Sequence, residues 1–96
     1  MPVPEVNELL IDEENDEKFA AHGIWARQVA QVLDNDYVIL PNRKERRAAF
    51  LIIGHDNGGT CIAIPIEPTH EPGVWRPVTA WMCKPSERAK LNQMPG

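Results

Sequence analysis

The strongest constraint on the fold is the tetrapeptide Asp56-Asn57-Gly58-Gly59, which separates two apolar segments at 48–55 and 60–66. Both segments are rich in β-branched residues, which favour strands. Glycine takes the positive φ values that tight hairpin turns require, so the tetrapeptide predicts a β-hairpin. The centre of the chain is therefore expected to form part of an antiparallel sheet.

Two helices are expected before this hairpin. Asp12 is a predicted N-cap, because its carboxylate can accept hydrogen bonds from the free amides of a first helical turn. This helix should run to about Ala21 and stop at His22 and Gly23, where glycine can adopt the left-handed cap conformation. Apolar residues then recur at spacings of three and four over 25–33, which predicts a second helix.

The remaining segments complete an α+β order. Strands are expected at 37–40 and 75–82, with a sheet edge or bulge at Pro77, because proline donates no ladder hydrogen bond. The Leu9–Ile11 run is either a short strand or the last residues before the first helix. Pro85 opens a last short helix through about residue 93. We therefore expect two N-terminal helices packed on a three- to four-stranded antiparallel sheet, closed by a short C-terminal helix.

A chain of 96 residues and 10.8 kDa is expected to form one domain, with a flexible arm at 1–8 and the folded part at 9–93. Separate cofactor and substrate lobes are excluded by this size. No run of about 18 apolar residues is present, and acids stand near the N-terminus where a signal peptide has Lys or Arg. Cys61 and Cys83 form no CxxC pair, so we expect reduced cysteines and a cytoplasmic protein without membrane contact.

The net charge of −4 conceals an asymmetry between the two parts of the chain. Residues 1–41 contain nine acids and two bases, whereas residues 42–96 contain eight bases and five acids. The acidic balance argues against tight general binding to nucleic acid and against direct DNA binding, because phosphate neutralisation supplies much of that affinity. Two groups of side chains remain candidates for a local basic face. The first is Arg43, Lys44, Arg46 and Arg47, and the second is Arg76, Lys84, Arg88 and Lys90.

Several single residues allow a structural and a functional interpretation. His22 either bonds the last carbonyls of its helix or serves as a general acid or base, and Lys18 lies one turn earlier on the same face. Arg76 is either salt-bridged or an exposed functional group. Trp25 and Trp75 suit the core better than a base-stacking surface.

No metal ion or cofactor is expected. The histidines and cysteines fall on separate predicted elements, without the short ligand spacing of a zinc finger or ribbon. The chain also lacks the GxxxxGK[ST], GxSxG and HExxH motifs of P-loop proteins, serine hydrolases and zinc proteases.

Several short motifs resemble the BrnT-like toxin family. Asp12-Glu13-Glu14-Asn15 is followed after six residues by His22-Gly23-Ile24, as in the family pattern Asp-Glu-Glu-Asn, six residues, His-Gly-Val. The later motifs agree in their order, over about residues 9 to 91: Ile53-Gly54, Gly58-Gly59, Val78-Thr79-Ala80 and Glu87-Arg88.

The resemblance implies a RelE-like fold and a ribonuclease toxin of a type II toxin–antitoxin system. Such toxins cleave RNA without a metal, through attack of the 2′-hydroxyl on the adjacent phosphate. The candidate catalytic residues are His22, His55 and Arg76. The candidate RNA-binding residues are Lys18, Arg43, Arg46, Arg47, Thr79 and Arg88.

The chain departs from the family at Trp81, where relatives often have arginine. If that arginine stabilises the transition state, its loss costs about 3 to 4 kcal/mol. An inert protein-interaction domain on the same scaffold is therefore the alternative hypothesis. The expected partner is an antitoxin with a ribbon-helix-helix DNA-binding domain, which would contribute an acidic amphipathic segment. Trp75 or Trp81, if exposed, would be the aromatic anchor for this segment.

Overall fold

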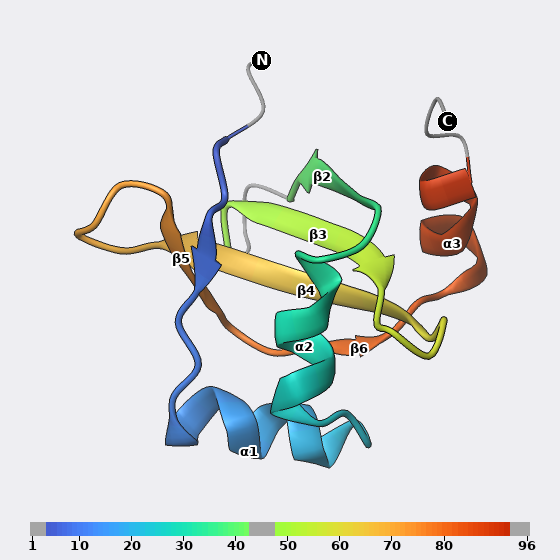
Figure 1. Cartoon of the computed structure of the whole chain (residues 1–96), viewed down its shortest axis with the longest axis horizontal. Coiled ribbons are helices and arrows are strands. Elements are labelled where there is room, and N and C mark those ends of the chain that lie inside the picture. The colour runs from blue at the N-terminus through green and yellow to red at the C-terminus, as the bar shows by residue number, and fades with distance from the viewer. Residues whose placement is uncertain (1–3, 43–47, 93–96) are drawn as a thin grey trace.

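The computed structural model describes residues 4–42 and 48–92. Figure 1 shows one twisted sheet with α1 and α2 on one side and α3 beside it. The helices are α1 (Glu13–Ala21), α2 (Ala26–Val32) and α3 (Pro85–Asn92). The strands are β1 (Glu8–Leu9), β2 (Tyr37–Pro41), β3 (Phe50–His55), β4 (Cys61–Pro68), β5 (Val74–Pro77) and β6 (Trp81–Met82).

The sheet has six strands and is mixed, so the predicted three- to four-stranded antiparallel sheet is wrong. Its order is β1-β5-β4-β3-β2, with β6 also paired to β4. The mixed character arises at one edge, where β1 runs parallel to β5 with Glu8 opposite Val74. The predicted strand at 75–82 is divided into β5 and β6, because the chain leaves the ladder at Val78–Ala80 after Pro77.

Part of the predicted N-terminal arm is fixed to the sheet. The backbone N–H of Asn7 donates to the Gly73 carbonyl at 2.8 Å, and the Trp75 indole N–H donates to the Glu5 carbonyl at 3.0 Å. Val6 is buried in the main core. Residues 5–8 therefore form part of the folded unit described by the structure.

Helix α1 begins after the predicted N-cap Asp12, and the same capping residues also join the helix to the sheet. The Asp12 carboxylate accepts from the Asn15 backbone N–H, and the Asn15 side chain accepts from the Asp12 N–H, each at 2.9 Å. The Asn15 amide also donates to the carbonyls of Leu10 and Pro77. The fully buried Asn15 thus closes the helix end and joins it to β5.

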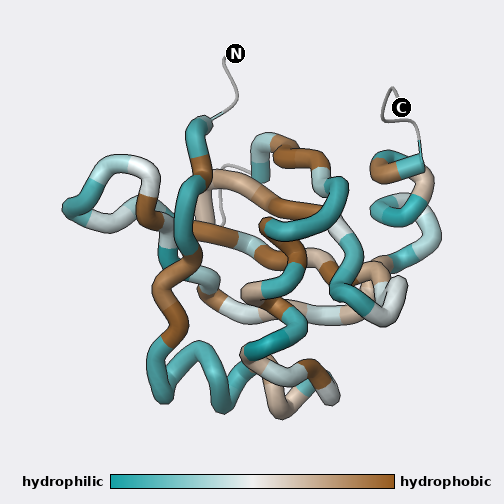
Figure 2. The backbone as a smooth tube through the Cα atoms, viewed as in Figure 1, coloured by the Kyte–Doolittle hydropathy of each residue, from teal (hydrophilic) through white to brown (hydrophobic). Residues whose placement is uncertain are grey.

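The two faces of the sheet have separate cores. Phe19, Val29 and Val32 of the first two helices pack on Ile52 and its neighbours on β4, Ile62, Ile64 and Ile66. On the other face, Leu91 of α3 packs with Ile53, Cys61 and Ala63. Figure 2 shows that β3 and β4 are largely hydrophobic and α1 largely hydrophilic, as expected for central strands covered on both faces.

Two expectations about side chains are corrected. Cys61 and Cys83 form a disulfide, so the expectation of reduced thiols is wrong; β6 runs antiparallel to β4 and places the two Cα atoms 5.3 Å apart. Trp25 is 68% exposed rather than in the core, because it lies at the N-cap of α2, outside the apolar face of that helix. Within the described ranges, no helix has the length and apolar character needed to cross a membrane.

Candidate functional site

A cleft of about 1120 Å³ lies between α3 and the sheet face that carries the second core. Its floor is apolar and includes Leu51, Ile53 and Val78. Its polar side chains come from segments far apart in sequence: His22, Asn42, Thr79, Lys84, Ser86, Glu87 and Lys90. The cleft therefore combines an apolar floor with hydroxyl, imidazole, carboxylate and ammonium groups.

Local sequence explains how these groups reach the cleft. His22 is the C-cap of α1, where its backbone N–H bonds the Phe19 carbonyl and Gly23 follows with a φ of +74°. Pro85 starts α3, and Glu87 and Lys90 are three residues apart on that helix. The chain turn at Gly23 and the start of α3 thus bring opposite ends of the chain to one cleft.

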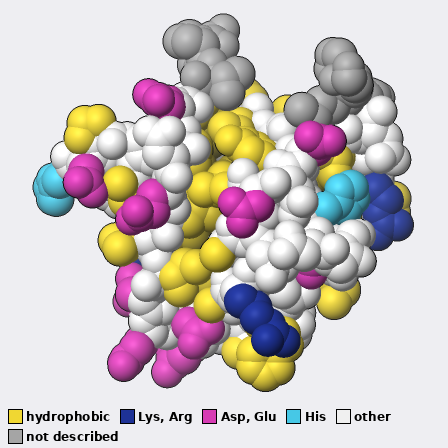
Figure 3. Space-filling model, in the orientation of Figure 1, with side chains coloured by type: hydrophobic (Ala, Val, Ile, Leu, Met, Phe, Trp, Pro, Cys, Tyr) yellow, Lys and Arg dark blue, Asp and Glu magenta, His cyan; other side chains and the backbone are white. Residues whose placement is uncertain are grey.

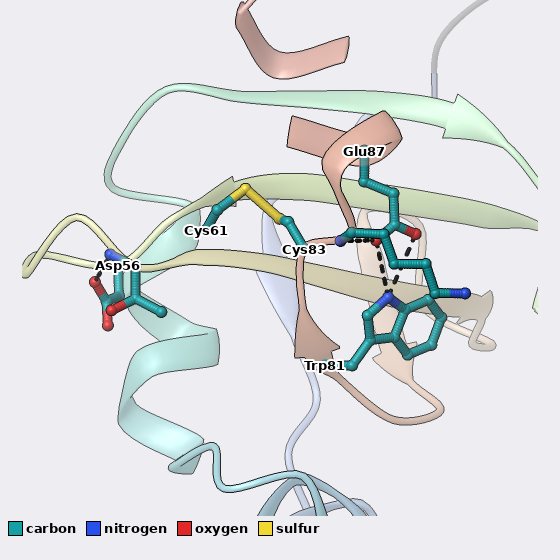
Figure 4. The surroundings of a disulfide bond; sticks show 7 residues. Asp56, Cys61, Trp81, Cys83 and Glu87 are labelled. Atoms are coloured by element: carbon teal, nitrogen blue, oxygen red, sulfur yellow. Dashed lines mark hydrogen bonds between the residues drawn. A yellow bond between two sulfur atoms is a disulfide. The ribbon is translucent and has the colours of Figure 1, made fainter. Parts of the chain in front are cut away.

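Trp81 and Glu87 form a polar contact in the cleft (Figure 4). The Trp81 indole N–H lies 3.0 and 3.3 Å from the two carboxylate oxygens of Glu87. Glu87 also accepts from the Lys84 backbone N–H at 2.8 Å, which satisfies a free amide at the start of α3. The Lys84 ammonium lies 5.8 Å from the centre of the Trp81 ring, a distance typical of a cation–π contact.

Arg76 lies in a cluster of carboxylates and does not line the cleft. Its guanidinium bonds Asp12 at 2.9 and 3.2 Å, Glu14 at 3.2 Å and Glu67 at 3.3 Å, and its side chain is only 16% exposed. The hydrogen bond to Asp12 is the main cause that raises the pKa of Arg76. One cation among three carboxylates repels a phosphate, so this geometry gives Arg76 a structural role between α1, β4 and β5.

The pKa of Asp12 is lowered by the same arrangement. The main cause is the hydrogen bond from the Asn15 backbone N–H, followed by the hydrogen bond from Arg76. Asp12 thus combines the helix cap and the ion pair in one side chain. This second role is consistent with the salt-bridged interpretation of Arg76.

A second aspartate has a purely structural environment. Asp56, in the hairpin turn, accepts from the backbone N–H groups of Gly58 and Thr60 and from the Gln28 side chain, at 2.8–2.9 Å. Burial alone raises the pKa of Asp56, but these hydrogen bonds outweigh it and the pKa is lowered. The carboxylate therefore fixes the turn and joins it to α2.

The structure brings together only part of the predicted site. His22 and Thr79 line the cleft. His55 lies on β3, opposite Cys61 of β4, and does not line the cleft. Arg88 is exposed on α3 outside the lining, and Lys18 lies 4.0 Å from Glu14. The predicted RNA contacts Arg43, Arg46 and Arg47 lie outside the described residues.

The two predicted aromatic anchors have different surroundings. Trp81 lines the cleft, but Trp75 packs against the main core and lies edge-on to Phe50 at 5.5 Å between ring centres. The sequence leaves a basic face open to Lys84 and Lys90. It does not indicate that Ser86 and Glu87 line the same cleft. The spacing of three residues between Lys84, Glu87 and Lys90 could have shown that these side chains share a helix face.

Comparison with known proteins gives no family for this chain: no family model matches it, and no curated protein matches it. No group of three or more His, Cys, Asp or Glu side chains suited to a metal ion occurs among residues 4–42 and 48–92.

Proposed function

We propose that the chain is a ribonuclease toxin of a type II toxin–antitoxin system, which cleaves RNA in the cleft between α3 and the sheet. The observation that carries the proposal is the presence of His22, Glu87 and two lysines in one cleft. Cleavage through the 2′-hydroxyl needs a proton acceptor, a proton donor and cations near the phosphate, and these side chains supply all three.

The reaction assigns a role to each kind of group. The 2′-oxygen attacks the adjacent phosphorus, its proton passes to one of the two proton-transfer groups, His22 or Glu87, and the bond from phosphorus to the 5′-oxygen breaks. The other group gives a proton to the departing 5′-oxygen. Lys84 and Lys90 stabilise the negative charge that develops on the phosphate oxygens. The products are a 2′,3′-cyclic phosphate and a 5′-hydroxyl.

A DNA strand that contains one ribonucleotide tests this chemistry. The purified chain should cleave only at the ribonucleotide and leave a 2′,3′-cyclic phosphate, because only that sugar carries the attacking hydroxyl. The matched all-deoxy strand should remain intact. Cleavage of the all-deoxy strand would refute 2′-hydroxyl attack, and failure to cleave either strand would favour the inert alternative.

The inert interaction domain remains a second candidate because of Arg76 and Trp81. Arg76 is held by three carboxylates, and Trp81 occupies the cleft at the position where the resembling family often has arginine. On this hypothesis the cleft binds protein only. Its apolar floor and its lysines suit an acidic amphipathic segment equally well.

For the toxin, the proposed partner is a cognate antitoxin with a ribbon-helix-helix domain. An acidic amphipathic segment of that partner would cover the cleft, pair with Lys84 and Lys90, and pack on Trp81. Both proteins would act in the cytoplasm, where the RNA is, although a disulfide such as Cys61–Cys83 is more common in oxidising compartments. Calorimetry with the product of the adjacent gene should show a stable complex that Trp81→Ala weakens, and unchanged affinity of Trp81→Ala would remove Trp81 as an anchor.

A further inference from the structure

A second groove lies between residues 4–7, which lead into β1, and the edge strand β2. β1 and β2 are the terminal strands of the order β1-β5-β4-β3-β2, yet one groove of about 750 Å³ is lined both by residues 4–7 and by residues 35–40. The segment that leads into β1 therefore lies across this groove from β2. None of the residues assigned to RNA cleavage lines it, so this groove is independent of the proposed function.

The edge strand β2 directs some of its backbone groups away from β3. The Asn42 N–H donates to the Ala49 carbonyl, so Asn42 is hydrogen-bonded to the strand beside it. In an antiparallel pair, every second residue is hydrogen-bonded to the neighbouring strand, so Leu40 and Val38 are the next residues of β2 that bond to β3. The intervening Tyr37 and Ile39 then direct their N–H and C=O groups away from β3. Within the described residues, β2 pairs with no strand other than β3.

The closeness of Tyr37 to β3 supports this register. Tyr37 lies opposite Gly54, and a Cβ added to Gly54 would lie 2.8 Å from the Tyr37 Cβ. Residues in a non-hydrogen-bonded antiparallel pair have the closer side chains, as seen here. Within the part of the chain that the structure describes, the outward N–H groups of Tyr37 and Ile39 have no backbone partner, and natural proteins often add a strand from a partner at such a sheet edge.

The described lining of the groove has one sign of charge. Among residues 4–42 and 48–92 it includes the apolar side chains of Val6, Tyr37 and Ile39 and the carboxylates of Glu5 and Asp36, and no Lys, Arg or His. Figure 3 shows apolar surface in the middle of this face with acidic side chains around it. An occupant with basic and apolar residues fits this lining, whereas an acidic segment is repelled.

We propose that β2 binds an extended segment of a partner protein in which apolar residues alternate with Lys or Arg. The segment adds a strand to the β2 edge and accepts hydrogen bonds from the N–H groups of Tyr37 and Ile39. Its apolar side chains enter the groove beside Val6, and its cations lie near Glu5 and Asp36. Backbone bonds supply the pairing, and the carboxylates select the charge of the partner.

The test uses a capped hexapeptide of alternating lysine and valine, with the glutamate–valine hexapeptide as its control. Calorimetry should detect saturable binding of the lysine peptide alone, and bound peptide should slow hydrogen exchange at the Tyr37 and Ile39 amides. Absence of binding, or equal binding of both peptides, would overturn the proposal. Self-association of the chain through β2 that excludes the peptide would assign the edge to a second copy instead and would also overturn it.

Two variants separate the backbone from the charges. Ile39→Pro removes an outward N–H without removing a β2–β3 hydrogen bond and should weaken peptide binding about tenfold, whereas Ile39→Val should bind as the wild type does. The Glu5→Gln, Asp36→Asn double variant keeps the backbone and should weaken binding about threefold, with a reduced salt dependence. Unchanged affinity of the folded Ile39→Pro variant, or of the double variant, would contradict the proposed mode.

Discussion

The indole N–H of Trp81 lies within hydrogen-bond distance of both carboxylate oxygens of Glu87, and this contact joins β6 to α3 at the cleft. Tryptophan supplies a hydrogen-bond donor at this position without adding a charge. The carboxylate is thereby held in one orientation, with Lys84 above the ring.

Trp81→Phe should lower the free energy of unfolding by about 1 kcal/mol, because it removes a donor to a charged acceptor and keeps most of the ring. Urea unfolding of the matched variant Trp25→Phe provides the control, since Trp25 is exposed and its ring lies outside both cores. The Trp25 variant should change stability by less than about 0.5 kcal/mol. Equal effects of the two substitutions would show that the Trp81–Glu87 contact contributes nothing specific.

Stability should fall in acid partly through Asp12. Its pKa is lowered in the folded chain from an ordinary value of 3.8, so the unfolded chain binds the proton first as the pH falls. The stabilisation is present above that ordinary value and is lost as the pH falls through the lower folded pKa. Asp12→Asn should therefore flatten the decline of unfolding free energy below about pH 4.

Asp16→Asn is the matched control for this pH dependence, because Asp16 is an exposed aspartate on the same helix. Its curve of urea midpoint against pH should change less than that of Asp12→Asn. An Asp12→Asn curve parallel to that of the wild type would contradict the role given to the Asp12–Arg76 pair.

The disulfide should contribute substantially to stability. Cys61 and Cys83 are 22 positions apart, and closing a loop of this length stabilises a folded chain by about 3 kcal/mol through its effect on the unfolded state. Reduction with dithiothreitol should lower the unfolding free energy by about this amount. The Cys61→Ala, Cys83→Ala variant should be insensitive to the reductant, and equal stability of the oxidised and fully reduced wild type would refute the expectation.

Local features of the fold could be predicted from sequence, and long-range ones could not. Asp12, Gly23 and the turn at 56–59 act on backbone within a few residues, so their chemistry is visible in the chain itself. The parallel pairing of Glu8 with Val74 and the cysteine pairing depend on how distant segments meet. The two-residue strand β1 shows too little alternation to predict a partner or a direction.

The candidate site also has residues with a local context and residues whose surroundings depend on distant segments. A histidine at a helix end has a recognisable local context, and His22 lines the cleft. Arg76 was equally prominent in the sequence, but Asp12, Glu14 and Glu67, which surround it, come from distant positions. Only the fold decides between the salt-bridged and the exposed arginine.

The most direct test of the proposed function compares RNA cleavage by His22→Ala and His70→Ala. Both variants lose one exposed imidazole, but only His22 lines the cleft. The cleavage rate of a fluorescent RNA should fall by a factor of about 10² to 10⁴ in His22→Ala, as for loss of a general acid or base, and should be unchanged in His70→Ala. Equal cleavage rates of His22→Ala, His70→Ala and the wild type would contradict the assignment of catalysis to the cleft.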